Sequence, residues 1–81
     1  MKFRKKPVVI EAKQYTGDNG QEIADFMHRQ RHALQGTKLL IGTLGGIMSA
    51  DINDWIIRGV QGEYYPCKPD IFDKTYERVE E

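Results

Sequence analysis

Two histidines and an aspartate stand at a spacing that could bind a metal ion. Asp25, His28 and His32 follow one another three and four residues apart, and in one continuous helix their side chains would share a side. Imidazole and carboxylate groups are zinc ligands, but no fourth ligand stands nearby in the sequence. The favoured interpretation is therefore a solvated helix face with an Asp25–Arg29 ion pair, and a zinc site is the weaker alternative.

The single cysteine, Cys67, is the best nucleophile that the chain offers. A reactive thiol needs a neighbouring base and positive charge, and Lys68 would lie on the opposite face of an extended strand. A packing role is therefore favoured for Cys67, and an enzyme would have to combine it with His28 and Asp70. We expect a non-enzymatic protein without a cofactor. One cysteine also cannot form an internal disulfide, which suits a reducing cytosol.

The segment from Asp54 to Asp70 holds the only tryptophan and two adjacent tyrosines. Because side chains alternate along a strand, neighbouring tyrosines point to opposite faces, so one of them must lie outside the core. An exposed aromatic ring beside a cation is typical of partner interfaces. The candidates for binding a ligand or partner are Trp55, Arg58, Tyr64, Tyr65 and Lys68. The alternative is purely structural, with these rings covering a thin sheet.

Two further patterns have weaker functional interpretations. The basic residues Lys2, Arg4, Lys5 and Lys6 could contact a nucleic-acid backbone, but four charges give weak binding that salt would remove. Nucleic acid is therefore not an expected partner. The glycine-rich residues 42–46 lack the Gly-Lys-Ser/Thr ending of a phosphate-binding loop, so a hairpin turn is favoured there.

The residues that precede these candidates predict one strand and one main helix. Residues 8–15 alternate in polarity as in a half-buried strand. Asn19 stands three residues before Glu22, the spacing of a helix cap. The apolar residues that follow share one helical face: Ile23, Phe26, Met27 and Leu34. The helix is therefore expected to fray only after His32 and to stop at Gly36.

Two hairpins and a short helix are predicted for the rest of the chain. Residues 38–44 and 47–50 flank Gly45-Gly46, and residues 55–60 and 63–68 flank Gln61-Gly62. Asp70 could cap a helix over residues 71–76, and residues 77–80 could add a strand. The predicted fold is α+β, with a small twisted antiparallel sheet or partly closed barrel of about five strands, one main helix after the first strand and a short C-terminal helix.

The composition indicates a single small domain over residues 1–81, with a basic arm at residues 1–6. Twelve basic residues balance twelve acidic ones, but residues 1–38 carry a net charge of +4 and residues 39–81 a net charge of −4. The apolar run after the basic start is too short for a signal peptide, and no run approaches a membrane span. We expect a cytoplasmic protein that does not bind membranes.

Two segments at the ends of the chain are distinctive, Lys2 to Ala12 followed by Tyr15, and Asp54 to Glu77. Both resemble a family of small proteins encoded by tailed bacteriophages and prophages. Such proteins usually carry Pro-Gly-Asp before the tryptophan or tyrosine, where this chain has Ile52-Asn53-Asp54. Asparagine can replace glycine in a left-handed turn, so the turn should be kept. The resemblance implies a phage accessory protein in a host cell, but the family supplies no reaction and no catalytic residues.

Two functions are therefore expected as alternatives. The first is a non-enzymatic accessory protein that binds a host protein, for example a defence component, or that sequesters a small nucleotide-like ligand. The second is a structural or assembly protein that forms a homo-oligomer through its sheet edges.

Overall fold

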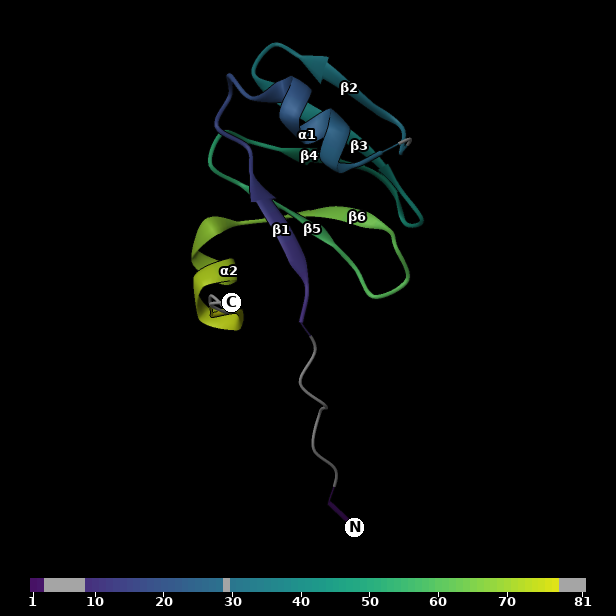
Figure 1. The fold of residues 1–81 in the computed structure, drawn as a ribbon, viewed down its shortest axis with the longest axis vertical. Helices are drawn as coiled ribbons and strands as arrows, with labels where there is room; N and C mark the ends of the chain where they lie inside the picture. The colour runs from purple at the N-terminus through teal and green to yellow at the C-terminus, as the bar shows by residue number, and fades with distance from the viewer. Residues whose placement is uncertain (3–8, 29, 78–81) are drawn as a thin grey trace.

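The computed structural model describes residues 1–2, 9–28 and 30–77, which form six short strands and two helices (Figure 1). The elements in chain order are β1 (Glu11–Gln14), α1 (Gly20–Phe26), β2 (His32–Gln35), β3 (Lys38–Thr43), β4 (Gly46–Ala50), β5 (Trp55–Arg58), β6 (Tyr64–Cys67) and α2 (Pro69–Thr75). The predicted α+β class is confirmed. The prediction of a single sheet or barrel of about five strands is wrong, because the described strands form two separate three-stranded sheets.

The first sheet joins the two ends of the chain in the order β1-β5-β6, and all its pairs are antiparallel. Ile57 of β5 stands opposite Ala12 of β1 and Tyr65 of β6. Because side chains alternate, Trp55, Ile57 and Tyr65 share one face of this sheet. Ile56, Arg58, Tyr64 and Pro66 share the other. The predicted hairpin around Gln61-Gly62 is present, and Gly62 has a φ of +85° in its turn.

The second sheet consists of consecutive hairpins in the order β2-β3-β4. The β3–β4 hairpin agrees with the prediction, although its two turn residues are Leu44 and Gly45 and Gly46 already pairs with Thr43. The strand β2 is a correction, because its residues were expected to continue the helix. Gly36 has a φ of +61°, but it turns the chain from β2 into β3 and does not end a helix.

Helix α1 ends at Phe26, much earlier than the helical spacing predicted. The backbone of His28 has a φ of +55°, a left-handed conformation that stops helical hydrogen bonding. Leu34, which was assigned to the apolar face of the helix, lies on β2 and is exposed. Asn19 precedes the helix as predicted, but its side chain bonds the Gln14 carbonyl and the Glu22 carboxylate and makes no backbone cap.

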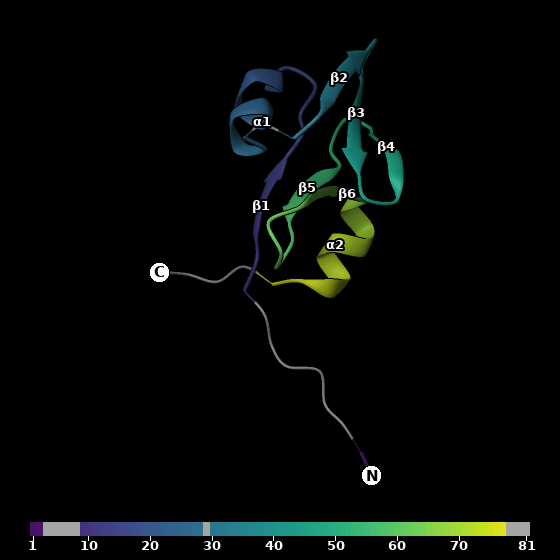
Figure 2. The same cartoon turned by 90° about the vertical axis from the view of Figure 1, so that its right-hand side faces the viewer.

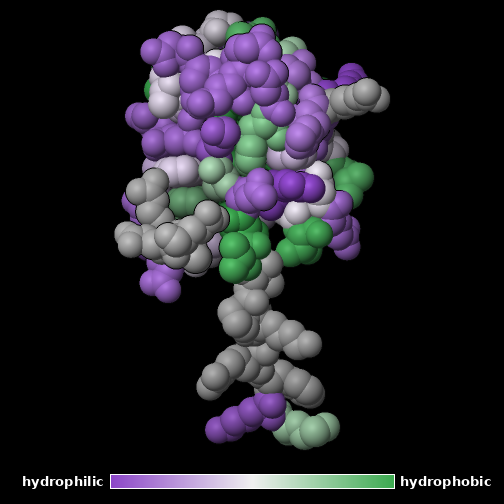
Figure 3. Space-filling model, viewed as in Figure 1, coloured by the Kyte–Doolittle hydropathy of each residue, from purple (hydrophilic) through white to green (hydrophobic). Residues whose placement is uncertain are grey.

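The main core lies between α1 and the two sheets. It contains Tyr15, Ile23, Met27, Leu39, Ile41, Ala50, Ile56 and Tyr64. Figure 2 shows α1 on one side of the molecule, with β4 and α2 on the other side. Hydrophilic side chains cover the region of α1, whereas apolar ones gather lower down, near the start of β1 (Figure 3).

A smaller apolar cluster lies under α2, on the opposite face of the first sheet. The rings of Trp55 and Phe72 stack with centroids 4.3 Å apart and planes 8° from parallel, and Phe72 also contacts Tyr76. Helix α2 begins at Pro69, two residues before the predicted start, so Asp70 lies in its first turn and Lys68 is the N-cap residue. The strand predicted over residues 77–80 lies, apart from Glu77, outside the described residues.

Neither described helix has the length and apolar character that crossing a membrane requires.

Candidate functional site

The five residues predicted to bind a ligand or partner do not form one surface. Tyr64 is 4 % exposed, and its ring packs edge-on against Phe26 in the main core. Trp55 is half-buried beneath Phe72 on the opposite face of the sheet. Arg58 is exposed at the far end of β5, where it pairs with Glu11 and Tyr64 in the strand register. The sheet therefore separates these side chains.

Tyr65 is the tyrosine that lies outside the main core, as the alternation of adjacent residues requires. It is half-buried on the face that α2 covers. Burial, together with the neighbouring hydroxyl of Tyr76, raises the pKa of Tyr65 to about 12. A phenol in this setting stays neutral throughout the physiological range, so Tyr65 serves as a packing residue with a polar tip.

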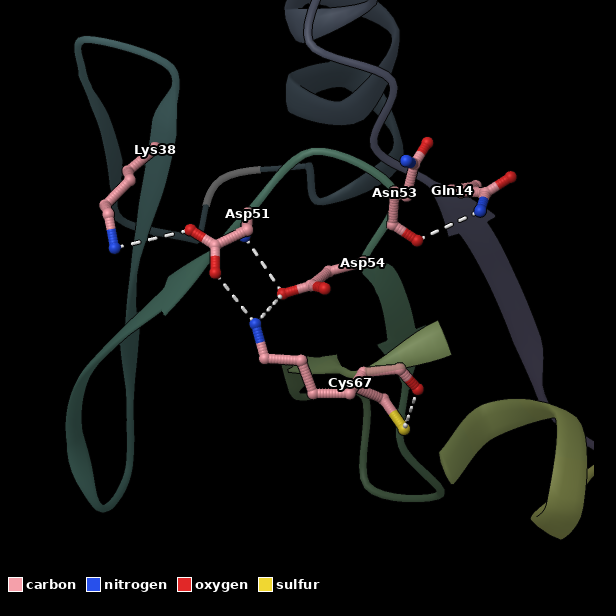
Figure 4. Close-up of polar contacts among 7 residues, drawn as sticks. Gln14, Lys38, Asp51, Asn53, Asp54 and Cys67 are labelled. Atoms are coloured by element: carbon pink, nitrogen blue, oxygen red, sulfur yellow. Dashed lines mark hydrogen bonds and ion pairs between the residues drawn. The ribbon is translucent and has the colours of Figure 1, made fainter. Parts of the chain in front are cut away.

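Lys68 belongs to a cluster of four charges that joins the two sheets at the β4–β5 turn (Figure 4). Its amine lies 2.9 Å from the carboxylates of both Asp51 and Asp54, and Lys38 of β3 lies 3.3 Å from Asp51. Hydrogen bonds and charge from Lys68 and Lys38 lower the pKa of Asp51. The same contacts with Asp51 and Asp54 raise the pKa of Lys68.

Asp54 is the buried member of this cluster, with 2 % of its surface exposed. Its carboxylate accepts hydrogen bonds from the Asp51 backbone N–H and from Lys68, each 2.9 Å long. Asn53 beside it has a φ of +80°, the left-handed conformation that was predicted for this turn. Asp54 and Lys68, which frame the most distinctive part of the sequence, therefore stabilise a turn.

Gln30 is a second polar link between the sheets, and nothing in the sequence pointed to it. Its side-chain carbonyl accepts the Tyr64 N–H at 2.9 Å, while its amide donates to the carbonyls of Tyr64 and Gly42 at 2.6 and 2.9 Å. One side chain thereby takes the place of a neighbouring strand along the open edge of β6. No periodicity reveals such a residue, because it lies between two elements.

The metal and nucleophile candidates are also separated. Asp25 is in α1, His28 follows the helix with a left-handed backbone, and His32 is on β2. The continuous helix face proposed for a zinc ion therefore does not exist. In the part of the chain that the structure describes, no three His, Cys, Asp or Glu side chains gather to hold a metal. Burial and the charges of Asp54 and Asp70 raise the pKa of Cys67, which favours its unreactive thiol form.

Another surface with exposed apolar residues lies on the side of the second sheet that faces away from the core. Leu39, Ile41 and Ala50 point into the core, so the residues between them point outward. We call this surface the outer face, and it comprises Arg31, Ala33, Leu40, Gly42 and Ile47. A groove of about 350 Å³ runs over these residues.

Gly42 forms the floor of this groove. It stands opposite Ile47 in the strand register and donates its N–H to the Arg31 carbonyl at 2.9 Å. A side chain at position 42 would come within 3.1 Å of the Arg31 Cβ. The glycine therefore leaves room between an arginine on one side and Ile47, which is 73 % exposed, on the other.

Among the five residues of the outer face, Arg31 carries a charge and none is acidic. Between Phe26 and Ala50 the sequence contains no Asp or Glu. Among the described residues, Arg31 makes no ion pair. The basic arm proposed at residues 1–6 lies almost wholly outside the described residues.

Comparison with known proteins adds no relative, because the chain matches no family model, no curated protein and no solved structure. The resemblance to small phage proteins stays a prediction.

Proposed function

We propose that the protein is a non-enzymatic accessory protein that binds another protein through its outer face. The observation that carries the proposal is the groove above Gly42, where exposed apolar side chains adjoin an arginine without an acidic partner among the described residues. A surface of this kind combines apolar contact area with one directional charge. In the setting that the phage resemblance implies, the partner is a host protein.

The charge of the outer face indicates what the partner presents. Arginine binds carboxylates through two parallel hydrogen bonds, and the apolar residues around it suit a neighbouring aliphatic or aromatic side chain. The partner surface is therefore acidic with an apolar centre.

A small nucleotide-like ligand has weaker support than a protein partner. Stacking a base requires an accessible aromatic ring. The ring of Trp55 already stacks on Phe72, and the ring of Tyr64 packs against Phe26 in the core. The outer face itself contains no aromatic residue.

Photo-crosslinking tests the proposal directly. A benzoylphenylalanine at Ala33, which is exposed on the outer face, should capture one host protein in infected or expressing cells, to be identified by mass spectrometry. The same probe at Val60, an exposed residue in the β5–β6 turn, serves as the control. Capture from Val60 and not from Ala33 would place the contact on the first sheet.

A pair of matched charge reversals measures the contribution of the outer face. Arg31→Glu should weaken binding of the purified captured protein by about tenfold or more, because a desolvated arginine contact becomes a repulsion. Arg58→Glu makes the same charge change at an exposed position on the hairpin that the sequence favoured, and it should leave the affinity within about twofold. The reverse ranking would show that the Trp55–Lys68 hairpin is the binding surface.

A further inference from the structure

The outer edge of β4 has backbone hydrogen-bonding groups that no other described residue uses. Gly42 of β3 donates its N–H to Arg31, on the β2 side. Because backbone groups alternate in direction along a strand, Leu39, Ile41 and Thr43 bond toward β4. Their partners Ala50, Met48 and Gly46 bond back. The N–H and C=O groups of Ile47 and Ser49 therefore point away from the sheet.

Proteins usually protect such an edge, and this chain protects the two edges of the first sheet. The free side of β6 is covered by Gln30 at Tyr64 and carries Pro66, which has no N–H. Strand β1 carries Glu11 and Lys13. Strand β4, in contrast, consists of Gly-Ile-Met-Ser-Ala, with no charge and no proline. Uncharged edges of this kind readily pair with another strand.

We propose that two copies of the chain pair through β4, antiparallel and related by a two-fold axis at Met48. Ile47 of each copy then stands opposite Ser49 of the other. Each such pair exchanges two N–H···O=C bonds, so the two pairs use all four outward groups of each strand. The second sheets of the two copies then form one six-stranded sheet, with the two β4 strands at its centre.

The side chains favour a second copy over an unrelated strand. An edge that pairs with itself brings identical residues near one another, so any charge on β4 would meet a like charge. Strand β4 carries none. The same register places Met48 of each copy opposite Met48 of the other, and this side chain is 44 % exposed in a single copy. Both apolar side chains leave water on pairing.

The dimer goes beyond the proposed function and does not depend on it. Pairing uses the edge of β4, whereas the proposed partner contacts the groove above Gly42. In the dimer the outer faces of both copies lie on one continuous sheet surface, which doubles the number of grooves. A bivalent partner would then bind more tightly than a single groove allows.

Charge exchange across the axis tests both the pairing and its register. Sedimentation velocity of the wild-type chain should show a concentration-dependent dimer. The variants I47K/S49K and I47E/S49E should each weaken it by about tenfold or more, since like charges then face each other twice. Mixing the two variants should restore the dimer. The variant I47K/S49E should dimerise alone, because position 47 faces position 49.

Two proline variants distinguish pairing through the edge of β4 from pairing through the edge of β2. Ser49→Pro removes an outward N–H of β4 and should abolish the dimer, whereas Leu34→Pro removes an outward N–H of β2 and should leave it intact. Circular dichroism should confirm that each variant keeps its fold. A wild-type chain that stays monomeric up to about 1 mM, or a dimer that survives both like-charge variants, would overturn the proposal. Neither outcome bears on crosslinking from Ala33.

Discussion

At the scale of single residues, the distinctive polar side chains of this chain hold the backbone together. Asp54 accepts hydrogen bonds from Asp51 and Lys68 at the turn between the two sheets. A buried carboxylate is stabilising only while its partners remain, because an unsatisfied donor or charge left behind is costly. Asp54 and Lys68 therefore matter first for folding.

Replacing Asp54 should destabilise the whole protein. We expect Asp54→Ala to lower the free energy of unfolding by about 2–3 kcal/mol, because the Asp51 N–H and the Lys68 amine lose their shared acceptor. Urea denaturation followed by circular dichroism measures the change. Asp73→Ala, on the exposed surface of α2, is the control and should cost less than about 0.5 kcal/mol. Equal effects at the two positions would contradict the structural role of Asp54.

The charge cluster also predicts how stability depends on pH. The pKa of Asp51 is lower in the folded protein than its ordinary value of 3.8. Its contribution is therefore fully present above that ordinary value and is lost as the pH falls through the folded pKa. Thermal unfolding of Asp51→Asn should be less sensitive to pH below about 4 than that of the wild type. Parallel Tm curves for the two proteins would exclude this contribution.

At the scale of elements, glycine and turn residues made the two hairpins predictable. The helical spacing of apolar residues, in contrast, gave a wrong prediction for the segment that forms β2. Residues around Gly45 and Gly62 turn where their sequences indicated. The spacing of Leu34 from Phe26 and Met27 suits a helix. However, His28 adopts a left-handed backbone that ends the helix, and the chain then forms strand β2. Gly36 needs a positive φ in either fold, so it could not distinguish a helix end from a hairpin turn.

The candidate site was less predictable than the fold. The alternation of adjacent tyrosines correctly required one of them to lie outside the core, but it could not say that α2 would cover that ring. The outer face was not singled out, because β2 was assigned to a helix and Arg31 therefore had no sheet to join. The acid-free stretch between Phe26 and Ala50 was the available signal.

The bridge formed by Gln30 should contribute strongly to the contact between the two sheets. We expect Gln30→Ala to cost about 2 kcal/mol of unfolding free energy, because the backbone groups of Tyr64 lose their partners in a half-buried site. Gln35→Ala, at an exposed position of β2, is the matched control and should be nearly neutral. Similar denaturation midpoints for both variants would show that water replaces the Gln30 side chain without cost.

At the scale of the whole molecule, the apolar residues form two clusters of unequal size. The main core joins α1 to both sheets, whereas the smaller cluster consists largely of rings between the first sheet and α2. Small, partly exposed clusters open at lower free energy than the core of the same protein. Helix α2 is therefore expected to detach before the rest of the chain unfolds.

The single tryptophan can report this local opening. Phe72→Ala removes the ring that stacks on Trp55, so the emission of Trp55 should shift to longer wavelength while the β-sheet signal in circular dichroism persists. Ile71→Ala, at an exposed position of the same helix, should leave the emission unchanged. Loss of both signals in one transition would show that α2 and the main core unfold together.

The order of pairing in the two sheets has a consequence for how the chain assembles during synthesis. Strands β2, β3 and β4 pair with strands that are next to them in the sequence, across short turns. Strand β1 instead pairs with the distant β5, where Glu11 stands opposite Arg58. Local contacts form faster than distant ones. As the chain leaves the ribosome from its N-terminus, the second sheet can form while β1 still has no partner. The β4 edge and the groove above Gly42 are thus presented before the protein is complete.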